Sequence, residues 1–370
     1  MTEASRGQGR TSAAAAVALA VVVLAGWLAL AGAWVALLFV DRGVSRIVWA
    51  VLGALLLWQL VPRPPRPRKQ AEPVDEQTAP GLHALASAVA DAAGCPPPRR
   101  ILLDTTYRVG ALPVGYARRA DLVLGLPQWT VLRPQERVAA VGLALAGADV
   151  LGRPAGAVVR LADDVLTAAR ELLEPPGKVG GDRVAAGYSV SNPVAVDVFE
   201  VNRVGRSVSK NVGAAGMMAL AAPVRLVQRA LGRAWAPCLA AGVLDADARV
   251  AGVAGREAAV GVLLTTAGVP AGLTAAASAA RYGRDPFQAL AESARPSRAE
   301  YTGRLVADAE RGSGPGPTTL QRVEALERGV PATGAAVDPG LAARADAEVV
   351  RLRAGLAARL TDELRAGSAT

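Results

Sequence analysis

Residues 132–147 have the sequence LRPQERVAAVGLALAG, and this stretch decides the fold. Its segment 133–136 is typical of a helix start, because proline fits the first turn of a helix, where its missing N–H leaves no hydrogen bond unmade. The stretch therefore predicts a helix over residues 132–151. The residues before it predict a second helix and a small sheet.

The second helix begins near Gly81 and ends at Gly94, where a glycine suits the left-handed C-terminal position. Four apolar residues repeat at helical spacing along it, namely Leu82, Leu85, Ala86 and Val89. The segments 101–103, 109–116 and 121–124 are β-branched or alternating, which predicts three short strands. These elements indicate a mostly helical α+β domain with a small sheet.

Three consecutive segments resemble the HtpX-like gluzincins, a family of membrane zinc metallopeptidases that includes the CAAX prenyl endopeptidases. They are 82–103 (LHALASAVADAAGCPPPRRILL), 122–129 (LVLGLPQW) and 132–141 (LRPQERVAAV). The resemblance covers most of residues 80–330 and is strongest over 82–147. It implies membrane helices and a zincin-like domain, in which one helix carries HExxH and a later helix carries a glutamate ligand.

The resemblance places HExxH on Leu143-Ala144-Leu145-Ala146-Gly147. In an active member the two histidines bind Zn²⁺ and the glutamate activates the metal-bound water. Here the ligand positions are Leu143 and Gly147, and the position of the general base is Ala144. None of these side chains can bind a metal or transfer a proton.

The resemblance also implies that the third ligand position is Val243, four residues before a retained Asp247, on a helix over 243–260. The late His-Pro-Pro signature is degraded to the segment 314–318 (GPGPT). Independently of any resemblance, the chain contains a single histidine, so no HExxH motif can exist in it.

These substitutions predict an inactive homologue of the zinc metallopeptidases, without a metal or another cofactor. Such a pseudopeptidase acts by binding or scaffolding, and an active peptidase relative is one candidate protein partner. Two alternatives stay open: an enzyme of another class with a new site in the same groove, and a zinc metalloendopeptidase by family inheritance.

The N-terminal region is apolar enough to enter a membrane. Residues 13–40 carry no charge and exceed the ~20 residues that a spanning helix needs. A second apolar run, 47–61, follows a short charged turn, so residues 1–61 predict a transmembrane helical hairpin. A cleaved signal peptide is the rival interpretation, because Arg6 and Arg10 precede the first run.

The net charge of +9 is concentrated near this hairpin. Residues 1–69 carry a net charge of +6, which leaves only +3 for the rest and excludes a nucleic-acid-binding surface. The segment 62–69 (PRPPRPRK) and the N-terminal arginines place both ends in the cytoplasm by the positive-inside rule. We therefore expect a multi-pass cell-membrane protein whose non-protein partner is the lipid bilayer.

The predicted domain organisation has four parts. Residues 1–61 form the hairpin, 62–79 a basic proline-rich linker, 80–330 the metallopeptidase-like domain and 331–370 a C-terminal helix. Asp338 and Pro339 suit the start of that helix. Its apolar seam predicts docking onto the domain, with a coiled coil as the alternative.

Two internal apolar runs need an interpretation. The run 212–224 is too short to cross a bilayer comfortably, and an interfacial position stays open for it. The run 258–280 is broken at 268–270 and predicts buried core.

The remaining polar candidates favour structural roles. His83 is expected to be a surface or capping residue. Three aspartates, Asp149, Asp245 and Asp247, are expected to be solvated helix carboxylates rather than an oxygen site for Mg²⁺ or Ca²⁺. Cys95 and Cys238 form no C-x-x-C motif, and the segment 177–178 (GK) lacks the preceding glycine of a phosphate-binding loop.

Overall fold

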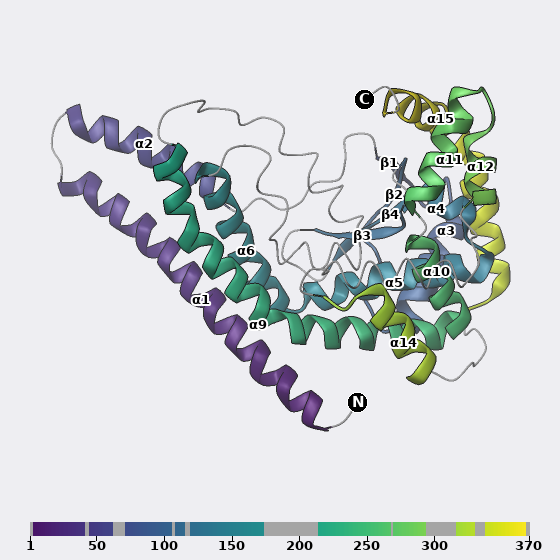
Figure 1. The fold of residues 1–370 in the computed structure, drawn as a ribbon, viewed down its shortest axis with the longest axis horizontal. Coiled ribbons are helices and arrows are strands. Elements are labelled where there is room, and N and C mark those ends of the chain that lie inside the picture. The colour runs from purple at the N-terminus through teal and green to yellow at the C-terminus, as the bar shows by residue number, and fades with distance from the viewer. Residues whose placement is uncertain are drawn as a thin grey trace.

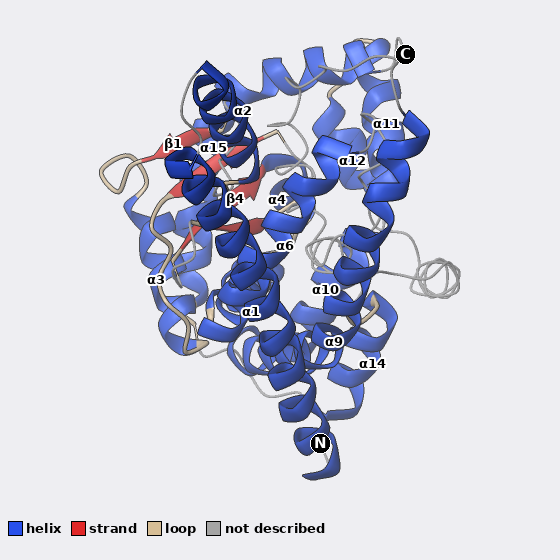
Figure 2. Cartoon of the chain, turned by 90° about the vertical axis from the view of Figure 1, so that its left-hand side faces the viewer, coloured by secondary structure: helices blue, strands red, loops and turns tan. Residues whose placement is uncertain are grey.

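A computed structural model describes residues 3–40, 44–61, 71–105, 108–114, 119–173, 214–267, 269–293, 316–329 and 337–367. The chain is mostly helical, with one small mixed sheet (Figures 1 and 2). The elements in chain order are α1 (Glu3–Val40), α2 (Val44–Leu60), β1 (Glu72–Val74), α3 (Pro80–Ala92), β2 (Ile101–Asp104), β3 (Gly110–Pro113), β4 (Ala120–Gly125), α4 (Leu126–Val131), α5 (Pro134–Gly152), α6 (Pro154–Leu173), α9 (Ala214–Ala254), α10 (Arg256–Ala267), α11 (Val269–Arg281), α12 (Pro286–Ser293), α14 (Thr319–Gly329) and α15 (Pro339–Gly367).

The sheet has the strand order β1-β2-β4-β3, in which β2 and β4 are parallel and the two outer pairs are antiparallel. Strand β1 lies inside the segment 62–79, which we expected to be linker throughout. Three residues are too few to show an alternating pattern, and β1 is stabilised by its pairing with β2. The other three strands fall where the sequence predicts them.

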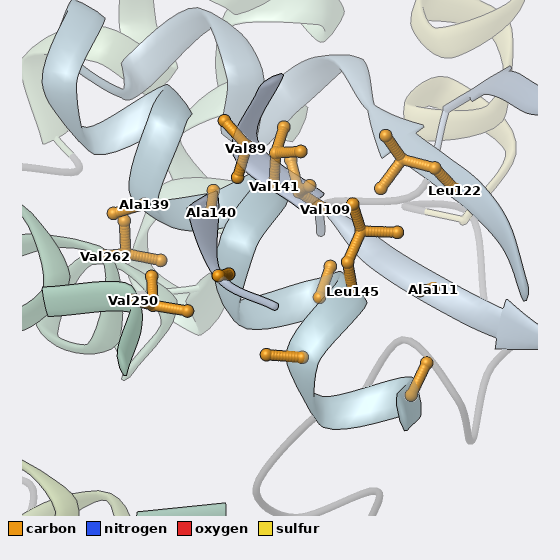
Figure 3. Close-up of a cluster of buried hydrophobic side chains, with 14 of the residues drawn as sticks. Val89, Val109, Ala111, Leu122, Ala139, Ala140, Val141, Leu145, Val250 and Val262 are labelled. Atoms are coloured by element: carbon orange, nitrogen blue, oxygen red, sulfur yellow. The ribbon is translucent and has the colours of Figure 1, made fainter. Parts of the chain in front are cut away.

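Helix α5, which the sequence predicts as a helix, lies at the centre of the core. It contacts α3, α9, α10, α15 and the strands β3 and β4. Figure 3 shows the resulting cluster, whose labelled members are Val89, Val109, Ala111, Leu122, Ala139, Ala140, Val141, Leu145, Val250 and Val262. A helix that is apolar around most of its circumference is stable only when it is buried on most sides.

The expected starts and ends of two helices are confirmed. Pro134 is the first residue of α5, and the Arg133 N–H donates to Glu136 Oε2 at 2.7 Å. Helix α3 ends before Gly94, whose φ of +64° is one that glycine adopts without strain. The four apolar residues predicted to face the core from α3 are all buried.

The two internal apolar runs are helical. The run 258–280 forms parts of α10, which ends at Ala267, and of α11, which begins at Val269, and many of its described residues are buried core. Residues 214–224 begin α9, a helix of 41 residues that continues past Pro223 and Pro237. The segment 243–260 is therefore not one helix, because α9 ends before Gly255, which has a φ of +91°.

The C-terminal helix docks onto the domain, as predicted. Asp338 Oδ1 accepts a hydrogen bond from the Gly340 N–H at 2.8 Å, which caps the start of α15. Helix α15 contacts α3, α5 and α11. Glu348 accepts hydrogen bonds from the Gly81 and Leu82 N–H groups at 2.9 and 2.8 Å, so α15 also caps α3.

The N-terminal helix α1 has 38 residues and lies along α6 and α9 (Figure 1). Among the described residues, its stretch Thr11–Phe39 is the single helical stretch that is by itself long and apolar enough to cross a membrane. Helices α5 and α6 meet the same criterion only as a pair, and they are bent by 78°. Helix α2 has 17 residues and contacts both α1 and α6.

Candidate functional site

The three positions that would form HExxH lie on α5. Leu143 and Gly147 are four residues apart and so lie on the same face of the helix, one turn from each other. Both are half-buried, and Ala144 is buried. None of the three side chains has a nitrogen, oxygen or sulfur atom, so none of them can bind a metal ion or transfer a proton.

Helix α9 packs directly against α5 at two glycines. A Cβ atom added at Gly142 would lie 2.8 Å from Val250 Cγ1, and one added at Gly242 would lie 2.7 Å from Val150 Cγ1. The two helices therefore run antiparallel, with the α9 segment 242–250 along the α5 segment 142–150. Glycine at these positions allows the close approach of the two backbones.

Val243 is buried in this α5–α9 interface. Because 242 contacts 150 and 250 contacts 142, Val243 lies toward the C-terminal end of α5. The family's third ligand position stays assigned to Val243 as a prediction. By the same register, the motif 143–147 lies opposite residues 245–249 of α9, a stretch that includes the buried Ala246.

Asp247 is held by a residue that the sequence did not suggest. The Arg322 guanidinium on α14 donates from Nε to Asp247 Oδ2 and from Nη2 to Oδ1, both at 2.7 Å. Both side chains are more than nine-tenths buried. The two residues are 75 positions apart in the sequence. The sequence feature that could have indicated Arg322 is its place beside apolar residues in an amphipathic helix.

The other two aspartates are also paired with arginines. Asp149 lies 3.5 Å from Arg153, and Asp245 lies 3.5 Å from Arg249. The expectation of solvated carboxylates is correct for Asp245, which is exposed, and wrong for Asp149 and Asp247, which α9 and its neighbours bury. Within the described ranges, no three His, Cys, Asp or Glu side chains gather in a way that would hold a metal ion.

His83 makes a structural contact and is half-buried, so it is neither a fully exposed residue nor a helix cap. Its Nε2 atom lies 2.9 Å from the Val74 carbonyl oxygen, so an N–H at this atom donates to strand β1. The contact joins the first turns of α3 to the edge of the sheet. The single histidine of the chain therefore stabilises the packing of α3 against β1.

Cys95 is buried and follows the C-terminal end of α3 in the sequence. Its Sγ lies 3.5 Å from the Ala90 carbonyl oxygen. Burial, together with the negative charge of Asp149, raises the pKa of the Cys95 thiol to about 11. Both Cys95 and Cys238 are free thiols.

A second buried polar cluster joins α6 to α9, and the sequence analysis did not find it. Gln228 Nε2 donates to Asp163 Oδ1 at 2.8 Å and to Thr167 Oγ1 at 3.1 Å, and Gln228 Oε1 accepts from Arg170 at 2.8 Å. All four residues are buried. The available signal was the spacing of 163, 167 and 170, which places three polar residues on one face of α6.

The segment 177–178 and the first two residues of the segment 314–318 lie outside the described residues. Comparison of the chain with family models, with curated proteins and with solved structures finds no match. The functional argument therefore starts from the residues and contacts of this chain.

Proposed function

We propose that this chain is a membrane-anchored pseudopeptidase, a catalytically inactive relative of zinc metallopeptidases that acts by binding a protein partner. The observation that carries the proposal is the apolar character of the side chains at Leu143, Ala144 and Gly147 on α5, a helix that packs against α9. Peptide hydrolysis at a zinc site needs ligands and a general base at these places.

The surroundings of these three positions support the same function. Both carboxylate oxygens of Asp247 accept hydrogen bonds from Arg322, so the negative charge of Asp247 is already compensated inside the protein. There is also a physical reason for all the zinc-ligand residues to be replaced together. A polar ligand side chain that stayed buried between α5 and α9 without a metal would destabilise the protein by several kcal/mol. What is left is a packed helical scaffold that serves recognition.

The anchor in this proposal is the hairpin of α1 and α2, with both ends of the chain in the cytoplasm. Large exposed apolar side chains are concentrated on these two helices: Val21, Val22, Leu28, Leu30, Val35, Leu37, Phe39, Ile47, Trp49, Val51, Leu55, Trp58 and Val61. Exposed apolar surface of this extent fits a lipid environment better than water. The positive charges at 62–69 support the cytoplasmic orientation.

Elemental analysis of the purified full chain tests the chemical part. We expect less than about 0.1 equivalent of zinc, because a site needs several His, Cys or carboxylate ligands. One tightly held zinc per chain, or proteolysis that a chelator abolishes, contradicts the proposal. A reporter fused after Lys69 tests the orientation, and activity in the periplasm contradicts it.

Cross-linking in native membranes, followed by mass spectrometry, tests the binding role. A protein that is recovered reproducibly with the wild-type chain supports it. A small molecule trapped covalently instead favours an enzyme of another class.

A further inference from the structure

Helix α1 changes its surroundings along its length. Ala16 and Ala20 are fully buried and belong to the main apolar core of the molecule. The large exposed side chains of α1 all lie between 21 and 39. A helical segment of this length spans ~28 Å, which matches the ~30 Å hydrocarbon core of a bilayer.

The boundary between protein and lipid therefore crosses α1 near residue 21. Beyond this residue, α1 carries its exposed apolar side chains up to the turn into α2, although Val23 and Leu24 still pack against the core. Helices α6 and α9 lie beside α1 on both sides of residue 21 (Figure 1). The part of α9 that lies along α1 therefore passes the level of this boundary.

That part of α9 carries a row of three arginines, which we call the α9 arginine row: Arg225, Arg229 and Arg233. They are spaced by four residues, so they lie on one side of the helix. Arg229 and Arg233 are exposed and Arg225 is half-buried. No acidic residue occurs between 214 and 244, and Leu226 beside the row is 65% exposed.

The neighbouring helix does not cancel this charge. Helix α6 carries three acidic and two basic residues, namely Arg160, Asp163, Asp164, Arg170 and Glu171. The two helices together keep a net charge of +2 over residues 154–173 and 214–244. Arg225 and Arg229 also interact within the chain, but a guanidinium has five N–H donors and can hold a phosphate at the same time.

We propose that the α9 arginine row binds the phosphate groups of anionic phospholipids in the leaflet that faces the domain. Arginine suits this role because its planar group forms two parallel hydrogen bonds to phosphate oxygens. Exposed Leu226 then lies at the boundary between headgroups and hydrocarbon. The inference rests on α1 being the membrane anchor of the proposed function.

The test uses the full chain reconstituted in bilayers of equal parts phosphatidylcholine and phosphatidylglycerol. After mild detergent extraction, mass spectrometry measures the ratio of the two lipids that stay bound. We expect several-fold enrichment of phosphatidylglycerol for the wild type and for the triple Arg→Lys variant of the row. The triple variant R225Q/R229Q/R233Q should lose the enrichment.

The matched control is R281Q/R284Q/R328Q, which removes three exposed arginines elsewhere. It should keep the wild-type ratio. An unchanged ratio in R225Q/R229Q/R233Q, or a loss in the control as well, overturns the inference. Extraction of membranes with alkaline carbonate distinguishes this failure from failure of the anchor. If carbonate releases the wild-type chain from membranes, the chain is not anchored. If the chain is retained but shows no lipid enrichment, only the inference about the α9 arginine row is contradicted.

Discussion

Asp247 on α9 and Arg322 on α14 form a buried ion pair in which each carboxylate oxygen accepts one guanidinium hydrogen bond at 2.7 Å. This pair joins α9 to α14 at Asp247, the aspartate that the resemblance to the HtpX-like family implies is retained. Its geometry is the strong, doubly bonded form of an arginine–carboxylate pair. Because both groups are buried, removing one of them leaves the other without its partner.

Replacing Arg322 with Met should destabilise the protein by about 3–5 kcal/mol, because it leaves a buried carboxylate without a partner. Urea unfolding of the detergent-solubilised chain measures the change. The double variant D247L/R322M should recover most of the loss, since it removes both charges. The control R328Q, at an exposed ion pair, should change the free energy of unfolding by less than about 0.5 kcal/mol. A loss below about 1 kcal/mol in R322M would show that the pair is not buried in solution.

Two glycine substitutions should have opposite effects. In Gly142→Ala the new methyl group meets Val250, which is fully buried and cannot move away, so we expect a loss of about 1–3 kcal/mol. In Gly252→Ala nothing lies within 4 Å of the added Cβ, and we expect a gain of about 0.5–1 kcal/mol from helix propensity. Thermal unfolding of both variants checks the sign, and equal effects would refute the close α5–α9 contact.

Glu348→Ala should cost about 1–2 kcal/mol, because two N–H groups at the start of α3 lose their acceptor. Glu348→Gln keeps one oxygen acceptor and should cost less. Hydrogen exchange at the amides of Gly81 and Leu82 locates the effect. If these amides exchange no faster in Glu348→Ala, the contact between α15 and α3 is not formed by this side chain.

The thiol of Cys95 should react slowly with iodoacetamide in the folded protein. A pKa of about 11 in place of about 9 lowers the thiolate fraction at pH 8 by about 100-fold, and burial slows the reaction further. Because the pKa is raised on folding, the free energy of unfolding should fall as the pH rises from 9 towards 11. Peptide mapping after alkylation gives the rate, and urea titrations at several pH values give the stability. Equal alkylation rates for folded and unfolded chain at pH 8 would contradict the burial of this thiol.

A grafted metal site tests the family resemblance itself. The variant L143H/G147H/V243E supplies two histidines and a glutamate at the implied ligand positions. It should bind zinc at least about tenfold more tightly than L143H/G147H, which is 1.4 kcal/mol or more. Isothermal titration measures both affinities. If L143H/G147H/A246E binds more tightly instead, the second motif lies three residues further along, and no gain in either variant would leave the resemblance without support.

Local signals in the sequence predicted the helices whose core faces are regular. The spacing of Leu82, Leu85, Ala86 and Val89 located α3, and Asp338 with Pro339 located the start of α15. The same reasoning missed the length of α9, because Pro223 and Pro237 are expected to interrupt a helix. Contacts of α9 with α1, α5 and α6 stabilise the helix across both prolines.

Some features of the candidate site could also be predicted from the sequence, and others could not. A single histidine is enough to exclude an HExxH motif, and this conclusion follows from the sequence alone. The partner of Asp247 could not be predicted, because Arg322 reaches it only through the packing of α14 on α9. The polar cluster around Gln228 also depends on two helices that are far apart in the chain.

The apolar run 13–40 shows a further limit of sequence patterns. Alanines suit both a lipid environment and close contact between helices, so hydropathy does not separate the two. Ala16 and Ala20 are buried against the domain, although they belong to the same uncharged run as exposed Phe39.

Because α1 is one helix of 38 residues, ~57 Å long, the proposed membrane anchor and the part that packs in the domain belong to one continuous element. A tilt of about 10° moves one end of such a helix by ~10 Å relative to the other. A helix whose apolar stretch exceeds the hydrocarbon core can accommodate the difference by tilting. If α1 is the anchor, as proposed, Ala16 and Ala20 couple such a tilt to the core of the domain, because no break in the helix separates them from the lipid-facing stretch.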